Sequence, residues 1–173
     1  MADLRELIKK DETFKRYRNI LKTVQGSLNI EKHLKEASWL HRGRKSRLLF
    51  EMRVSPQKLQ EAILIDMSNR SRLVELKTLL LNEQELLSTA ISLGKKHIRA
   101  TYAVVLKEYG ATKESHMLVV DKVFSAGIQV LNEIDKGVDV LDLLVKDIDQ
   151  ASFGMRNVTE TLKMVLERKD GSV

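Results

Sequence analysis

The chain of 173 residues carries 30 Lys and Arg against 24 Asp and Glu, a formal net charge of +6, with one Pro and no Cys. This length fits a single domain, and a composition that is 43% apolar and 31% charged is able to bury a core. The lack of Cys excludes disulfide bridges, thiol catalysis and thiolate metal sites.

No segment predicts a membrane span or a secretory signal. The longest uninterrupted apolar stretch, 102–106, contains five residues, whereas a membrane-spanning helix needs about 20. Met1-Ala2-Asp3 leads directly into charged residues, unlike a signal peptide. We therefore expect a cytoplasmic protein that does not bind a membrane.

Composition and periodicity predict an all-α fold. Eight Gly, one Pro and 5% aromatic residues favour helices over strands. Apolar residues recur at spacings of three, four or seven from Leu4 to Val24, and Gly26-Ser27 ends that helix. A second helix is expected from Asn29 to Leu40. Residues 41–47 lack apolar side chains and are interpreted as a loop, a solvated turn at Gly43 or a polar helix.

A long helix is expected after residue 54. Ser55-Pro56 is a strong helix start, and the helix extends to Tyr109, where Gly110 ends it and Thr112 caps the next one. We predict one break or kink, either in the polar stretch 68–71 or at the capping-box pattern 82–85.

The C-terminal region has the most regular pattern. Its apolar residues alternate at spacings of three and four: Leu141, Leu144, Ile148, Ala151, Met155, Val158, Leu162 and Val165. Such a coiled-coil-like seam either pairs with a second copy of the chain or closes an intramolecular bundle. We expect Gly137 to separate this helix from the preceding one, although a second register through Val138 would let the two fuse.

Positive charge is concentrated in the first third of the chain. Residues 1–54 contain 14 Lys and Arg against 7 Asp and Glu, whereas residues 55–173 contain 16 against 17. The sequence thus divides into a basic N-terminal region, 1–54, and a bundle or oligomerisation region, 55–173. The candidate nucleic-acid-binding residues are Arg42, Arg44, Lys45, Arg47, Lys15, Arg16, Arg18 and Trp39.

Arginine-rich segments beside aromatic residues suit phosphate pairing and base stacking. The same charges would also suit an acidic protein surface, or the chain's own acidic residues around Asp142, Asp147 and Asp149. Trp39 and Phe14 are interpreted first as core residues and second as stacking platforms.

No motif predicts an enzyme. The four His residues lack metal-ligand spacing, and His97 lies on an apolar stripe, so it is interpreted as a core or interface residue. Neither a glycine-rich phosphate loop nor a nucleophile motif is present. We expect no cofactor and no metal.

The sequence therefore predicts an elongated, antiparallel, all-α bundle of about five helices, one of them long. The predicted function is that of a non-enzymatic, homo-oligomeric accessory protein that binds nucleic acid with low sequence specificity. The alternative is a scaffold, adaptor or assembly chaperone that acts by helix packing. The predicted oligomerisation residues are Leu141, Leu144, Ile148, Met155, Val158, Leu162 and Val165.

Overall fold

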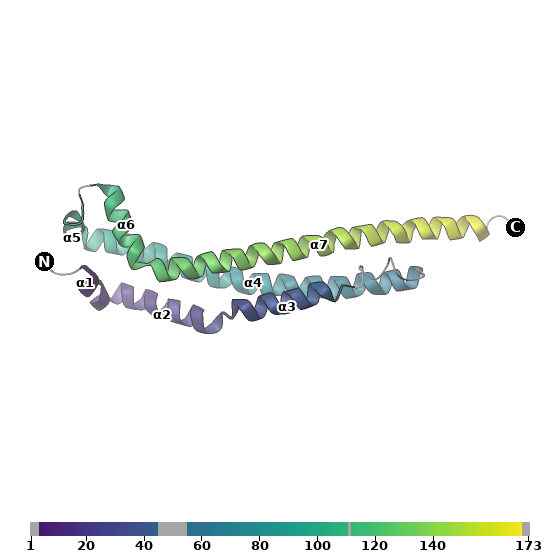
Figure 1. Cartoon of the computed structure of the whole chain (residues 1–173), viewed down its shortest axis with the longest axis horizontal. Helices are drawn as coiled ribbons and strands as arrows, with labels where there is room; N and C mark the ends of the chain where they lie inside the picture. Colours follow the sequence, from purple (N-terminus) through teal and green to yellow (C-terminus); the bar gives the residue numbers. More distant parts are fainter. Residues whose placement is uncertain (1–3, 45–54, 111, 171–173) are drawn as a thin grey trace. The chain divides into compact units, whose positions relative to one another are not determined.

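The computed structural model describes residues 4–44, 55–110 and 112–170, and the all-α prediction is confirmed because these residues form helices and no strand. The helices are α1 (Leu4–Lys10), α2 (Glu12–Ser27), α3 (Ile30–Arg42), α4 (Pro56–Thr101), α5 (Ala103–Lys107), α6 (Lys113–Val123) and α7 (Ser125–Asp170), as Figure 1 shows. Two of them, α4 and α7, have 46 residues each.

Several predicted helix ends are confirmed. α4 begins at Pro56, where the Ser55 hydroxyl accepts a hydrogen bond from the Lys58 N–H at 3.3 Å. Thr112 caps α6 through its hydroxyl, which accepts from the Ser115 N–H at 3.2 Å. Between α5 and α6, Gly110 has a φ of 156°, a conformation that only glycine adopts readily.

The predicted breaks within the long helices are wrong. α4 continues through both 68–71 and 82–85, and α7 continues through Gly137. Leu80 and Leu87, on either side of 82–85, are fully buried, and Gly137 also lies on the buried face of α7. Tertiary packing thus keeps each of these helices continuous at positions where local signals favour a helix end. The helices break instead at Asp11, at Tyr102 and at Phe124, so α4 ends at Thr101 and not at the predicted Tyr109.

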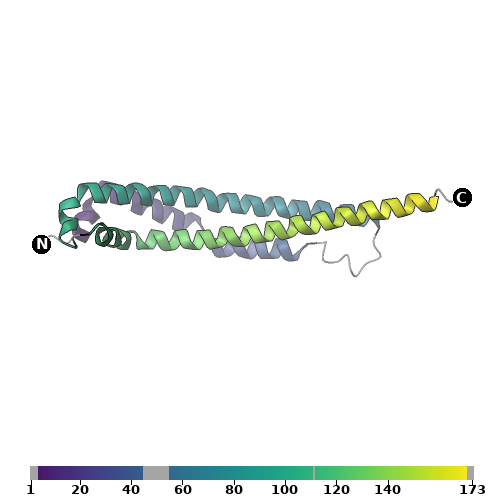
Figure 2. The ribbon, with the colours of Figure 1, turned by 90° about the horizontal axis from the view of Figure 1, so that it is seen from above.

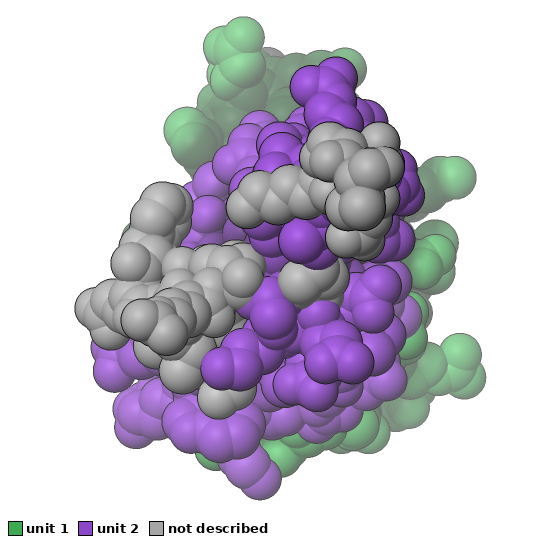
Figure 3. Space-filling model, turned by 90° about the vertical axis from the view of Figure 1, so that its right-hand side faces the viewer, with its two compact units in different colours: residues 1–30, 80–136 green, residues 31–79, 137–173 purple. Residues whose placement is uncertain are grey.

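The chain forms two compact units, each built from two separate stretches of sequence. Unit 1 comprises residues 1–30 and 80–136, and unit 2 comprises residues 31–79 and 137–173, as coloured in Figure 3. Neither unit coincides with the predicted regions 1–54 and 55–173, which describe how charge is distributed along the sequence.

In unit 1, α2 and the first turns of α7 both run antiparallel to the second half of α4. The start of α2 lies near the end of α4, where Asp11 contacts His97, and the end of α2 lies at Glu83, which accepts from Ser27. Within this unit, the second half of α4 and the first turns of α7 lie side by side in the views of Figures 1 and 2.

The core of unit 1 contains a cluster of aromatic rings. The rings of Tyr17 and Phe124 lie 4.6 Å apart, and the Tyr17 hydroxyl accepts a hydrogen bond from the Gly127 N–H at 3.2 Å. Phe14 packs edge-on against Phe124, with ring centroids 5.9 Å apart, so its interpretation as a core residue is confirmed.

In unit 2, α3 and α7 pack along the first half of α4, again antiparallel to it. The core includes Leu59, Ala62 and Met155, against which Ile63 and Leu162 pack. Along α4, Leu59 and Leu73 are fully buried fourteen residues apart, and the buried Asp66 lies midway between them. A buried acidic side chain at such a position favours one helix register over others.

Candidate nucleic-acid interface

The exposed face of α3 carries the most distinctive arrangement of the predicted binding residues. On the opposite face, Ala37 and Leu40 are buried in unit 2. This amphipathic division leaves Trp39 with 73% of its surface exposed, so its interpretation as a core residue is wrong. A tryptophan exposed to this extent is unusual, because indole is largely apolar.

Basic side chains flank Trp39 on the same face. Lys32, Lys35 and Arg42 are exposed and lie seven and four residues before and three residues after Trp39, which are spacings of one helix face. We call these four residues the α3 stripe. Within the described part of the chain, Arg42 makes no ion pair, so its guanidinium group is available to an external anion.

The acidic residues of α3 are already engaged. Glu31 pairs with Lys35 at 2.6 Å, a contact between exposed side chains that contributes little to stability. Glu36 accepts from Arg72 of α4 at 2.7 Å, and this hydrogen bond lowers the pKa of Glu36. Glu31 therefore offsets the charge of Lys35 in the α3 stripe, whereas Glu36 offsets that of Arg72 on α4.

The end of α3 is bound to α7. Asp147 accepts from His41 Nε2 and from Arg44 Nη1, both at 2.6 Å, and Arg44 Nε donates to the His41 carbonyl at 3.2 Å. The hydrogen bond from His41 lowers the pKa of Asp147 against the effect of burial, and the charge of Arg44 lowers it further. Only 7% of Arg44 is exposed, so its guanidinium group is engaged inside unit 2.

Five further cations are predicted as binding residues. Lys45 and Arg47 lie outside the described residues. Lys15, Arg16 and Arg18 are exposed on α2 in unit 1, where Lys15 pairs with Glu12 at 2.6 Å.

The acidic residues of α7 neutralise cations of the same chain. Besides the Asp147 contacts, Asp142 pairs with Lys77 and Asp149 with Arg70, each at 2.5 Å. The acidic residues of this region thus pair with cations of the same chain, as the intramolecular alternative predicts. The sequence did not reveal the partners on α4, because only the packing register aligns them with these carboxylates.

The predicted oligomerisation residues divide into two groups. Leu141, Ile148 and Met155 are buried by other helices of the same chain, and Leu144 and Leu162 are partly buried. Val158 and Val165 are about half exposed. The first part of the seam therefore closes an intramolecular bundle, and only its last turns remain accessible to a second copy.

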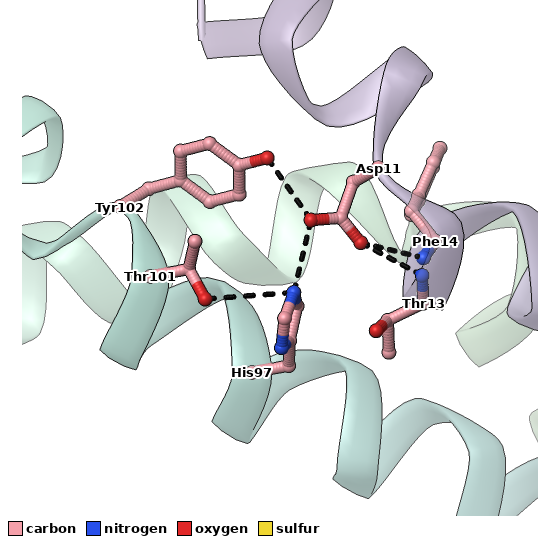
Figure 4. Close-up of polar contacts among 6 residues, drawn as sticks. All are labelled: Asp11, Thr13, Phe14, His97, Thr101 and Tyr102. Carbon is pink, nitrogen blue, oxygen red and sulfur yellow. Dashed lines mark hydrogen bonds and ion pairs between the residues drawn. The ribbon is translucent and has the colours of Figure 1, made fainter.

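A second polar cluster, in unit 1, is structural. Asp11 Oδ1 accepts from the N–H groups of Thr13 and Phe14 at 2.8 and 3.1 Å and so caps α2. Its Oδ2 accepts from His97 Nε2 at 2.9 Å and from the Tyr102 hydroxyl at 3.0 Å, as Figure 4 shows. Burial alone would raise the pKa of Asp11, but the hydrogen bonds from His97, Phe14 and Tyr102 outweigh it and lower that pKa. The interpretation of His97 as a residue that packs between helices agrees with this contact.

Neither a metal site nor a membrane span is found in the described ranges. No three His, Asp or Glu side chains group there as ligands of a metal ion, and no helix is sufficiently long and apolar to cross a bilayer. When the chain is compared with protein-family models, with curated proteins and with solved structures, none of them matches.

Proposed function

We propose that this chain is a non-enzymatic accessory protein that binds single-stranded nucleic acid with low sequence specificity through the α3 stripe. The observation that carries the proposal is the exposed Trp39 on the same helix face as Lys35 and Arg42. Arg44 takes no part in the proposal, because Asp147 engages it.

The chemistry of single-stranded nucleic acid fits this face. An unpaired base presents an apolar ring that stacks on an indole, an interaction that contributes about 1–3 kcal/mol per base. Lysine and arginine on either side of the indole would pair with successive phosphates and release counterions. Neither contact reads the edge of a base, so sequence specificity would be low.

The only Trp of the chain, Trp39, reports directly on this binding. We expect an oligothymidylate of about 15 nucleotides to quench its fluorescence at low salt, with an affinity that falls steeply as salt is raised. Unchanged fluorescence, together with no binding of a labelled oligonucleotide at low salt, would refute the proposal.

Variants separate this face from general positive charge. Trp39→Ala and Arg42→Gln should each weaken binding of the labelled oligonucleotide by about tenfold or more. Lys146→Gln removes the same charge from an exposed position on α7 in unit 2 and should leave binding nearly unchanged. The double variant Arg16→Gln/Arg18→Gln tests the predicted contribution of α2 separately. Equal losses for Lys146→Gln and Arg42→Gln would mean that only net charge matters.

A second candidate function, assembly by helix packing, is favoured by exposed apolar side chains on α7. Leu143 and Phe153 each have 67% of their surface exposed, more than a solvated helix face usually presents. A homo-oligomer or a scaffold complex would cover them. The double variant Leu143→Glu/Phe153→Glu should then reduce the mass measured by light scattering at high protein concentration. A wild-type chain that is monomeric at that concentration would contradict self-assembly.

A further inference from the structure

A hollow of about 190 Å³ lies in unit 1, between the end of α4 and helices α5 and α6. Ala103, Leu106 and Met117 supply its apolar surface, and Leu106 is almost completely buried beneath it. Liquid water occupies roughly 30 Å³ per molecule, so the hollow has the room of about six waters. This is the space of one large apolar side chain, and it is smaller than the 300 Å³ or more of typical small-molecule sites.

The turn before α6 fixes the shape of this hollow. Gly110 reverses the chain with its φ of 156°, and a Cβ there would lie 2.6 Å from Ser115, so only glycine fits. The His116 ring, which lines the hollow, donates from Nε2 to the Gly110 carbonyl at 2.7 Å. Because a carbonyl oxygen can only accept, Nε2 carries the proton and the ring orientation is set.

Three cations surround the apolar surface. Arg99, Lys107 and Lys113 line the hollow, and none of them forms an ion pair within the ranges that the structure describes. Arg99 also lines a neighbouring hollow together with Lys95 and Lys96, where Lys95 pairs with Asp121 at 2.8 Å and Lys96 extends the positive surface along α4. The nearby carboxylates of Glu108 and Glu114 are exposed and lie outside both linings.

Two lining residues are followed in the sequence by exposed apolar side chains. Val104 follows Ala103 in the chain and has 77% of its surface exposed, and Leu118 follows Met117 with 72% exposed. A free anion would leave the apolar lining of the hollow uncovered, whereas an apolar side chain of a polypeptide would cover it. The surface thus combines one apolar hollow with unpaired positive charge.

We propose that this surface, which we call the α5–α6 hollow, docks an acidic peptide segment of a partner protein. One large apolar side chain of that segment fills the hollow, and carboxylates on either side of it pair with Arg99, Lys107 and Lys113. Charge complementarity selects an acidic partner, and the size of the cavity limits the anchor to a single side chain. The α5–α6 hollow shares no residue with the α3 stripe, so either site can exist without the other.

Three fluorescein-labelled peptides test the proposal by anisotropy at low salt. The probe is Glu-Glu-Phe-Glu-Glu, one control replaces Phe by Ser, and the other replaces every Glu by Gln. We expect the probe to bind at least about tenfold more tightly than either control. Equal binding of all three peptides, or no binding of the probe, would overturn the proposal.

Matched variants locate the binding site. Lys107→Gln/Lys113→Gln should weaken binding of the probe at least about tenfold, and Ala103→Trp should do so by filling the cavity without a change of charge. Lys22→Gln/Lys136→Gln removes two exposed positive charges elsewhere in unit 1 and should have little effect. Circular dichroism establishes that each variant is folded, and the NMR signals of the His116 ring should shift only when the hollow can be filled.

Binding of the peptide probe should not depend on the α3 stripe. Trp39→Ala and Arg42→Gln should leave binding of the peptide probe unchanged. If Lys107→Gln/Lys113→Gln instead weakens oligonucleotide binding and leaves peptide binding unaltered, the hollow belongs to a nucleic-acid surface and the peptide proposal is wrong.

Discussion

Asp11 Oδ2 and His97 Nε2, 86 residues apart in the sequence, lie 2.9 Å from each other and join the start of α2 to the last turns of α4. The same carboxylate caps α2 through its other oxygen. One side chain therefore both begins a helix and fixes where that helix packs. Because the Asp11 side chain is largely buried, its loss would leave several polar groups without a partner.

We predict that Asp11→Ala lowers the free energy of unfolding by about 2–3 kcal/mol, from the lost cap and the unsatisfied His97 and Tyr102. Asp11→Asn should cost less, because asparagine is also a good N-cap. Thermal unfolding followed by circular dichroism measures both. Glu12→Gln, which changes an exposed neighbouring carboxylate, is the control, and an equal effect for all three substitutions would contradict the assigned role.

Acid should destabilise the protein through the same carboxylate and through Asp147. Both have a pKa lowered below the usual 3.8, so the stability that each contributes is present above about pH 4 and is lost as the pH falls through the folded-state pKa. We expect the melting temperature to fall between about pH 4 and pH 2. The double variant Asp11→Asn/Asp147→Asn should start from a lower melting temperature and lose less of it over this interval. An acid transition as steep as that of the wild type would show that other carboxylates dominate it.

A third prediction concerns two glycines of α7. A Cβ at Gly127 would lie 2.5 Å from the Tyr17 hydroxyl and 3.0 Å from Ile91 Cδ1, whereas a Cβ at Gly154 would meet nothing within 4 Å. Gly127→Ala should therefore destabilise the protein by about 1–3 kcal/mol through overpacking. Gly154→Ala should stabilise it by roughly 0.5–1 kcal/mol, since alanine is the better helix former. Chemical denaturation of both variants tests the pair, and a gain in stability at Gly127 would mean that Tyr17 moves away easily.

The sequence predicts the helices of this chain better than their interruptions. The starts at Ser55-Pro56 and Thr112 and the turn at Gly110 depend on local chemistry, which single residues reveal. Asp11 is also a local capping signal, but it lies between apolar residues at helical spacing, and this periodicity obscured it. The continuity of α4 past Asn82 and of α7 past Gly137 depends instead on buried contacts with other helices, which no local pattern contains.

The candidate site was predicted only in part for a similar reason. The charge count of residues 1–54 drew attention to Arg42 and Arg44 equally, although one is exposed and the other is bound to Asp147 from α7. Arg42 is the last residue of α3, whereas Arg44 lies two residues beyond the end of that helix and pairs there with Asp147. Which of them faces solvent depends on how the end of α3 packs in unit 2.

This difference between Arg42 and Arg44 gives the last prediction. Arg44→Gln should lower the free energy of unfolding by about 1 kcal/mol, because Asp147 loses one of its two partners, and it should leave oligonucleotide affinity nearly unchanged. Arg42→Gln should do the reverse, with unaltered stability and weaker binding whose salt dependence is less steep, since one phosphate contact is removed. Melting temperature and anisotropy titrations at two salt concentrations measure both effects on the same samples. If Arg44→Gln weakens binding as much as Arg42→Gln while both variants remain folded, Arg44 must leave Asp147 to reach the nucleic acid, and the interface extends beyond the α3 stripe.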